Sequence, residues 1–243
     1  MIQREMYMKR IRPFIGTDLV KVMTGIRRCG KSVMLNLIQD ELKASGIQDA
    51  QMISFNFEVM SNAHLCTAQA LHEEVLKRAA AITGKVYLFF DEIQEVVQWE
   101  KAINSFRIEL DGRYVEFTIY PFSFAEFLEL YRTVEPGASD AAAFQQYLTL
   151  GGMPYLANLR YAPEPCRQYL HDIYNSVVLN DVVRRNKIRD VDLLARIVAY
   201  VIGNIGTTFA STSIAKFLKS EHRTVAPETV LNYICLLYTS PSP

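Results

Sequence analysis

The feature that most constrains the fold is the octapeptide GIRRCGKS at residues 25–32. It fits the pattern G-x-x-x-x-G-K-[ST], in which glycines let the backbone curl until successive N–H groups point at phosphate. An apolar run precedes Gly25 and a segment with helical spacing follows Lys31, as such a loop requires. The alternative is a glycine-rich turn that matches by chance. The flanking patterns favour the phosphate loop, and with it a P-loop NTPase parallel α/β sheet flanked by helices.

The polar groups of the loop predict its ligand. Lys31 would reach the β- and γ-phosphates of a nucleotide, and the Ser32 hydroxyl would ligate Mg²⁺. The helix that begins at Lys31 would add its positive dipole end. We therefore expect ATP and Mg²⁺ as cofactors. The residues expected to bind the nucleotide are Gly25, Arg28, Cys29, Gly30, Lys31 and Ser32.

Two features of the loop leave alternatives open. Cys29 lies at a helix N-terminus, where the pKa of a thiol tends to fall, so it is either a redox-sensitive group or a small residue that fills the loop. Arg27 and Arg28 either face solvent or act on a partner in trans.

A second motif lies at the end of the apolar run VYLFFDEIQ. Asp91 would hold the Mg²⁺ through water, and Glu92 would orient or deprotonate the attacking water, a catalytic role worth ~10²–10⁴ in rate. The alternative is a solvated helix start, where Asp and Glu are common. Nucleotide kinases usually lack the second carboxylate, so the pair favours ATP hydrolysis over a kinase reaction.

The first half of the chain alternates runs typical of strands with runs typical of helices, and the pattern becomes helical after Pro121. We expect a P-loop core at residues 1–121 and a helical connector at residues 122–163. A helical, winged-helix-like region is expected at residues 164–234.

Composition narrows the range of partners. The chain carries 26 Lys and Arg against 26 Asp and Glu, so it has no net charge that would attract it electrostatically to nucleic acid or membrane. No apolar run approaches the ~20 residues that span a bilayer. The four scattered cysteines fit a reducing compartment. We expect a cytoplasmic protein with no membrane partner.

Five segments carry a resemblance to a known family: VKVMTGIRRCGKSVML, ISFNFE, YLFFDEIQEVVQWEKAINSFR, GRYVEFTIYPFSFAEFLEL and LGGMPYL. Together they resemble the prokaryotic AAA-like ATPases of AAA family 14 type, over essentially residues 1–234. The GGMP at Gly151–Pro154 resembles the GGxP box of signalling and defence-type ATPases. In this family a C-terminal domain of unknown function with a restriction-nuclease-like core usually follows.

The resemblance implies an ATP hydrolase and adds one residue to the site. Arg113 stands where the family has the arginine of its GRY motif. It would contact the γ-phosphate bound by a neighbouring subunit, which implies a homo-oligomer. The alternative is a solvated arginine at the start of a strand.

The chain departs from the family pattern at residues 110–113. Family members continue here into a strand that ends in a polar sensor residue and then into a short helix, both of which are absent. The missing strand would lie between the P-loop strand and the strand that ends at Asp91. Its loss would leave backbone groups on both neighbours unpaired, which is costly in an interior. The alternative is that Asp111-Gly112 forms a tight turn and the strand from Arg113 takes the vacant place.

The final segment, CLLYTSPSP at residues 235–243, translates back to one reading frame of a common transposase-type sequencing adapter. We expect it to be an artefact and the natural protein to continue past Ile234, so that the nuclease-like domain is lost here. The alternative is a genuine tail rich in Ser and Pro.

The segment TSIAKFLKSEHRTVAPETVLNYI predicts two short helices, as in a helix-turn-helix or winged helix. The residues expected to face the core are Ile214, Phe217, Leu218, Val230, Leu231 and Ile234. DNA is a candidate partner through basic side chains that could meet phosphates, namely Lys216, Lys219, Arg223 and those of residues 184–189. The alternative is an intramolecular packing unit with solvated lysines.

These observations favour an ATP-binding P-loop ATPase fragment whose nucleotide state moves a winged-helix or nuclease-like effector in the intact protein. The second hypothesis is a nucleotide-gated DNA-binding or signalling switch with little or no turnover. ATPase rates with and without duplex DNA would separate the two. The third is a P-loop kinase, against which Glu92 and the absence of an arginine-rich lid count. The fourth is a chain that cannot fold properly.

Overall fold

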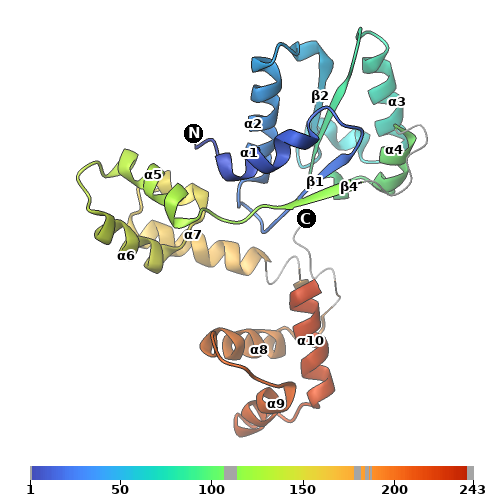
Figure 1. Cartoon of the computed structure of the whole chain (residues 1–243). Coiled ribbons are helices and arrows are strands. Elements are labelled where there is room, and N and C mark those ends of the chain that lie inside the picture. The colour runs from blue at the N-terminus through green and yellow to red at the C-terminus, as the bar shows by residue number, and fades with distance from the viewer. Residues whose placement is uncertain (1, 107–113, 178–181, 184–185, 187, 240–243) are drawn as a thin grey trace. The chain divides into compact units, whose positions relative to one another are not determined.

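The computed structural model describes residues 2–106, 114–177, 182–183, 186 and 188–239, so the junction at residues 111–112 lies outside the described ranges. The chain divides into two compact units, of which the first ends at Arg160 and the second begins at Tyr161 (Figure 1). The first unit contains short parallel sheets flanked by helices, and the described part of the second contains helices. The protein is therefore of mixed α/β class with a helical C-terminal region.

In the described residues, four strands form two parallel pairs. β1 (Val20–Thr24) pairs with β4 (Tyr114–Thr118). β2 (Met52–Asn56) pairs with β3 (Tyr87–Asp91), with Asn56 opposite Asp91. Parallel pairing places the C-terminal ends of both strands of a pair at one edge. The phosphate loop follows β1, and the Asp91-Glu92 pair follows β3.

The two strand pairs are separate sheets. Among the described residues, β1 and β3 form no ladder with each other, and β4 pairs with β1 alone. All residues of β1 are only half-buried, whereas strands inside a parallel sheet are normally buried on both faces. The described strands therefore do not show the alternative in which β4 fills a place between β1 and β3.

Helices surround these strands. They are α1 (Glu5–Ile11), α2 (Lys31–Ala44), α3 (Ala68–Ala79) and α4 (Trp99–Ser105), with α5 (Phe124–Val134) and α6 (Asp140–Leu150) after β4. A capping box begins α5: the Ser123 hydroxyl accepts the Glu126 N–H, and the Glu126 carboxylate accepts the Ser123 N–H. This reciprocal pair fixes where α5 starts.

Two apolar clusters hold the first unit. One lies under α2 and gathers Tyr7, Met8, Ile11, Cys29, Met34, Ile38, Leu42, Phe89, Phe117 and Ile119. The other lies between β2, α3 and α4 and gathers Ile53, Phe55, Phe57, Leu65, Leu71, Val75, Val96 and Ala102. Because the first cluster contains Phe89 of β3 and Phe117 of β4, side-chain packing joins the two strand pairs where no ladder does.

The second unit contains α7 (Pro163–Asn175), α8 (Val191–Gly203), α9 (Ser211–Ser220) and α10 (Pro227–Thr239). Ile214, Leu218 and Val230 are fully buried against α8, as expected. Leu231 is 50% exposed, so its assignment to the apolar face is wrong. Successive residues of a helix point about 100° apart, so the neighbour of buried Val230 turns towards solvent.

The described residues of the second unit contain no strand, so they show a helix pair α9–α10 and no wing. Helix α10 continues through Thr239, across Cys235, where the adapter-derived segment is predicted to begin. The interpretation of that segment stays a prediction.

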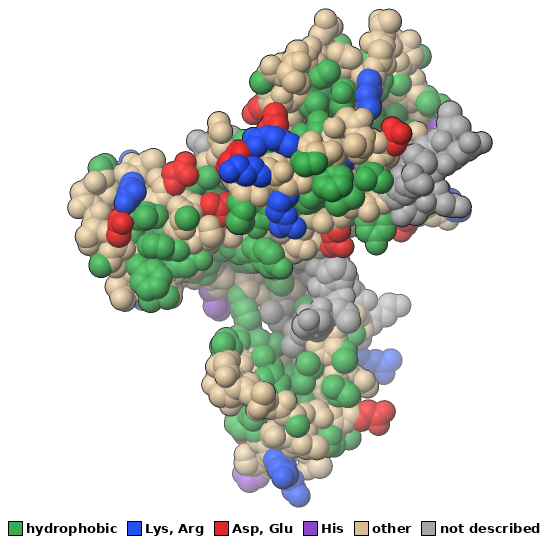
Figure 2. All heavy atoms as spheres, viewed as in Figure 1, with side chains coloured by type: hydrophobic (Ala, Val, Ile, Leu, Met, Phe, Trp, Pro, Cys, Tyr) green, Lys and Arg blue, Asp and Glu red, His purple; other side chains and the backbone are tan. Residues whose placement is uncertain are grey.

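None of the helices in the described part of the chain is long and apolar enough to cross a membrane. Figure 2 shows acidic and basic side chains interspersed over the visible face of the first unit. This mixture agrees with the balanced composition of the chain.

Candidate nucleotide-binding site

The octapeptide at residues 25–32 forms the connection from β1 to α2 (Figure 1). Three of its residues have positive φ angles: Gly25 at 141°, Arg28 at 63° and Gly30 at 104°. Two are glycines, which adopt such angles at little cost, whereas an arginine in this region is uncommon. The loop therefore has the curled backbone that its sequence predicts.

Gly25 permits a close approach of a distant segment. A Cβ atom at this position would lie 2.1 Å from the carbonyl oxygen of Ile119, which no real contact tolerates. The Ile119 N–H donates to the Thr24 carbonyl at 2.7 Å, just before the loop. The chain leaving β4 therefore supports the start of the loop, and only glycine fits there.

Lys31 lies folded into the loop. It is only 8% exposed, and its ammonium donates to the carbonyl of Gly25 at 2.9 Å and to that of Ile26 at 3.3 Å. Carbonyl dipoles thus satisfy a buried positive charge. The same ammonium could exchange these carbonyls for phosphate oxygens, which are stronger acceptors for a cation.

The start of α2 suits an anion. Gly30 is the N-cap, and no side chain caps the first turn of the helix. N–H groups of a first turn without an intrahelical partner, together with the helix dipole, attract phosphate. Ser32 lies in this turn and is exposed, as a ligand of Mg²⁺ would need to be.

Cys29 is fully buried in the core under α2. Burial raises the pKa of its thiol, although the charges of Lys31 and Arg4 act in the opposite direction. The expected tendency towards a lowered pKa at the helix N-terminus is therefore wrong here. Burial in this core fits the alternative in which Cys29 is a small residue that fills the loop.

The two loop arginines differ in surroundings. Arg27 lies 3.8 Å from the carboxylate of Glu58, which follows β2. Arg28 is exposed at the tip of the loop. An exposed guanidinium at this position can meet a phosphate or a second molecule.

The acidic pair lies at the end of β3. The Asp91 carboxylate accepts the Asn56 amide at 3.2 Å, and its carbonyl accepts the Phe57 N–H at 3.1 Å. Glu92 has a φ of 53° and accepts a hydrogen bond from the Gln94 amide. Among the described residues, no hydrogen bond or ion pair joins this pair to Lys31 or Ser32. Phe89 of β3 does share a core with Cys29 and Met34, which places the two motifs on one core.

No group of three or more His, Cys, Asp or Glu side chains that could hold a metal ion occurs in the described part of the chain. The predicted site needs fewer protein ligands, because Mg²⁺ bound with a nucleotide is held by one or two protein oxygens, phosphates and water. The oxygens of Ser32 and Asp91 fit that role. Both are half-buried or exposed and of the hard type that Mg²⁺ prefers.

Two further features of the loop surroundings were not assigned by sequence reasoning. Gly152 of the GGMP segment packs against Phe122, whose N–H donates to the Gly152 carbonyl at 2.7 Å. A Cβ at Gly30 would lie 3.9 Å from the Pro154 ring and 3.4 Å from the Arg4 guanidinium. The GGMP segment and Arg4 therefore border the phosphate loop. The glycines of the GGMP segment marked it in the sequence as a segment of interest, whereas nothing in the sequence distinguished Arg4 from other charged residues.

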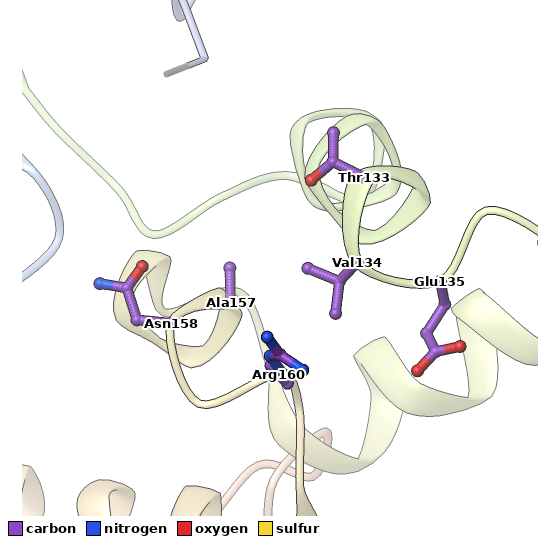
Figure 3. Close-up of a pocket in the computed structure, with 6 residues that line it drawn as sticks. All are labelled: Thr133, Val134, Glu135, Ala157, Asn158 and Arg160. Atoms are coloured by element: carbon purple, nitrogen blue, oxygen red, sulfur yellow. The ribbon is translucent and has the colours of Figure 1, made fainter.

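Two hollows in the described part of the first unit are lined by residues outside the loop. One, of about 500 Å³, is lined by the C-terminal end of α5 and the segment near Arg160 (Figure 3). Another, of about 440 Å³, lies beside α1 and the start of α5 and is lined by Met6, Tyr7, Tyr120, Pro121, Phe122, Ser123, Glu126, Tyr147 and Gly152. Arg113, the remaining predicted catalytic residue, lies outside the described residues.

The first unit is therefore an α/β domain with short parallel sheets and a curled, glycine-containing loop between β1 and α2. Residues 17–109 match the family model described as an AAA domain, which identifies an AAA-like ATPase domain in this part of the chain. Residues 141–240 match a family model described as a domain of unknown function (DUF8612). The first match suggests a nucleotide-binding, ATPase-like function.

Curated relatives are uncharacterized. The chain is 30% identical to a protein of Haemophilus influenzae over 260 residues, which covers 98% of this chain and 64% of the relative. It is 27% identical to a protein of Methanocaldococcus jannaschii over 248 residues, covering 88% of this chain and 53% of the relative. The chain thus spans less than two thirds of the length of either relative.

Proposed function

We propose that the first unit binds Mg-ATP in the loop at residues 25–32, and that the intact protein is an ATPase whose nucleotide state moves a C-terminal effector. The AAA domain match at residues 17–109 supports nucleotide binding. The residue assignments rest on the motif and its geometry. In this proposal Gly25, Arg28, Cys29, Gly30, Lys31 and Ser32 form the nucleotide site.

The observation that carries the proposal is the position of Lys31. An ammonium buried in a curled loop, held by two carbonyls of that loop and next to an uncapped helix start, is poised for an anion. Neutral carbonyls are weaker partners for it than phosphate oxygens. Phosphate binding would therefore draw Lys31 away from Gly25 and Ile26.

Hydrolysis would use the acidic pair. Asp91 would hold Mg²⁺ through water, and Glu92 would take the proton of the water that attacks the γ-phosphorus as ADP leaves. Arg113 of a neighbouring subunit would contact the developing charge in a homo-oligomer. The roles proposed for Asp91, Glu92 and Arg113 rest on the sequence motifs in which these residues stand. Glu92 is half-buried directly after β3, which is compatible with its role.

A second candidate is a switch that binds nucleotide with little turnover. The separation of β1 from β3 in the described residues favours it, because hydrolysis requires the loop after one strand and the carboxylates after the other to be held in fixed register. In this reading, nucleotide binding acts through conformation alone.

DNA is the proposed partner of the helix pair α9–α10 in both readings. Arg223, one of the expected phosphate contacts, forms ion pairs with Asp190 and Asp192. Lys216 and Lys219, both exposed, remain as candidates. Part of the expected basic surface is therefore neutralised within the protein.

Calorimetric titration with Mg-ATP tests the proposal. We expect Lys31→Ala to abolish measurable affinity, because it removes the cation of the loop, and Glu92→Gln to retain it, because that carboxylate acts after binding. Lys43→Ala is the matched control: this lysine lies at the other end of α2 and pairs with Asp49 at 2.7 Å on the surface. Equal affinity in the wild type and Lys31→Ala would refute the proposal.

A further inference from the structure

Arg4 is a buried cation that the nucleotide site does not explain. Its side chain is only 2% exposed. The guanidinium lies 4.6 Å from the centre of the Tyr7 ring and 5.1 Å from that of Phe122, in cation–π contact with both. An arginine is almost never buried this deeply unless its donors are paired.

The donors of Arg4 reach two segments that lie far apart in the sequence. Nη1 donates to the Cys29 carbonyl of the phosphate loop at 3.0 Å. Nη2 donates to the Tyr120 carbonyl after β4 at 2.8 Å, and Nε donates to the Glu126 carboxylate in the first turn of α5 at 2.9 Å. One planar group therefore connects the phosphate loop with the start of α5.

The bond to Cys29 determines the direction of the next N–H group. In a trans peptide, the carbonyl of one residue and the N–H of the next point in opposite directions within one plane. Arg4 binds the Cys29 carbonyl, so the Gly30 N–H points away from the Arg4 guanidinium. In a phosphate loop, inward-pointing N–H groups are the ones that bind the ligand.

The bond to Glu126 connects the same guanidinium to a helix start. The Glu126 carboxylate also accepts the N–H of Ser123 at 2.9 Å, as part of the capping box of α5. Burial acts to raise the pKa of this carboxyl, but hydrogen bonds from Arg4 and Ser123 outweigh it and hold the pKa below its ordinary value. Glu126 is therefore ionised at neutral pH and forms a charged pair with Arg4.

The backbone of Arg4 supports a specific role. Its φ and ψ angles are 47° and 46°, in the left-handed region that is unfavourable for a residue with a side chain. Such conformations persist where the surrounding contacts over-determine them. Here those contacts are the ones to the loop, to Tyr120 and to α5.

We propose that Arg4 is a positioning residue that orients the Cys29–Gly30 peptide for phosphate and couples nucleotide binding to the first turn of α5. The proposal rests on nucleotide binding by the loop. Because coupling is reciprocal, a nucleotide that fixes the loop also fixes Arg4 and the α5 start, and movement of α5 alters the affinity for nucleotide.

Two measurements on the 243-residue chain test this, namely Mg-ATP affinity and amide hydrogen exchange at residues 120–127 with and without Mg-ATP. Arg4→Lys keeps the charge but cannot reach all three acceptors. We expect it to weaken Mg-ATP binding about tenfold, or about 1.4 kcal/mol. In the wild type, Mg-ATP should slow exchange at residues 120–127, and Arg4→Lys should abolish that response. A purely structural role would change exchange equally with and without nucleotide.

Arg12→Lys is the matched control, because Arg12 also anchors the N-terminal segment through ion pairs, to Glu5 and Glu41, but does not contact the loop. It should bind Mg-ATP within twofold of the wild type. Glu126→Gln keeps Arg4 in place but removes the charged link to α5, so it should also abolish the exchange response. This variant tests the coupling role if Arg4→Lys fails to fold.

The outcomes separate the two proposals. Wild-type affinity and a wild-type exchange response in the Arg4 and Glu126 variants would overturn the coupling role while leaving nucleotide binding intact. Absence of Mg-ATP binding by the wild type itself would overturn the proposed function and this inference with it.

Discussion

Single residues of the phosphate loop show how narrowly its shape is fixed. Gly25 meets the Ile119 carbonyl at a distance that excludes any side chain, and Arg4 donates a hydrogen bond to the Cys29 carbonyl. Lys31 closes the loop from inside by binding two of its carbonyls. Contacts with the Ile119 carbonyl, with Arg4 and with Lys31 therefore fix the shape of the loop when no ligand is bound.

Gly25→Ala tests this arrangement. The added methyl would collide with the backbone of Ile119 at a φ that alanine rarely adopts, so we expect a loss of about 2–4 kcal/mol in the free energy of unfolding. Denaturant unfolding measures it. Gly137→Ala is the control, because a Cβ there meets no atom within 4 Å and no positive φ is required. A stability change below 1 kcal/mol in Gly25→Ala would contradict the described contact.

The curled backbone of residues 25–32 could be predicted from the sequence, because the spacing of its glycines reflects a local backbone requirement. The ligand assigned to these residues stays a prediction. The sequence does not predict properties of a residue that depend on its surroundings in the folded chain. The pKa of the Cys29 thiol follows from burial in the core under α2, which no local pattern reveals. Arg4 looks like any charge in a polar N-terminal stretch, and its role depends on carbonyls more than twenty residues away in sequence.

At the scale of elements, the alternation of strands and helices is visible in the sequence, but the neighbours of each strand are not. The described strands form two pairs where one parallel sheet was expected. The AAA domain match ends at residue 109, just before the departure at residues 110–113. The alignment with the Haemophilus relative extends over 260 residues and covers 98% of this chain. The interpretation that a strand is missing there stays a prediction.

Amide hydrogen exchange in β1 and β3 tests that interpretation. Alternate N–H groups of a parallel strand point to opposite neighbours. If β1 pairs only with β4, every second amide of β1 should exchange much faster than its neighbours, and β3 should behave in the same way. Slow exchange at all amides of both strands would mean that a further strand lies between them.

At the scale of the molecule, the chain consists of an α/β unit and a helical unit, each with its own core. The domain of unknown function matched at residues 141–240 begins within α6 and continues through the second unit. Helix periodicity predicted the buried faces of α9 and most of α10, because it depends on spacing alone. The wing, which would need strands, is not among the described residues.

The central claim is that a nucleotide binds in the first unit, inside the loop at residues 25–32. The most direct test is a structure of the 243-residue chain with Mg²⁺ and a non-hydrolysable ATP analogue. The account predicts phosphates within the curl of that loop, with the Lys31 ammonium moved from the Gly25 and Ile26 carbonyls to phosphate oxygens. A nucleotide bound elsewhere, with Lys31 still held by those carbonyls, would contradict it.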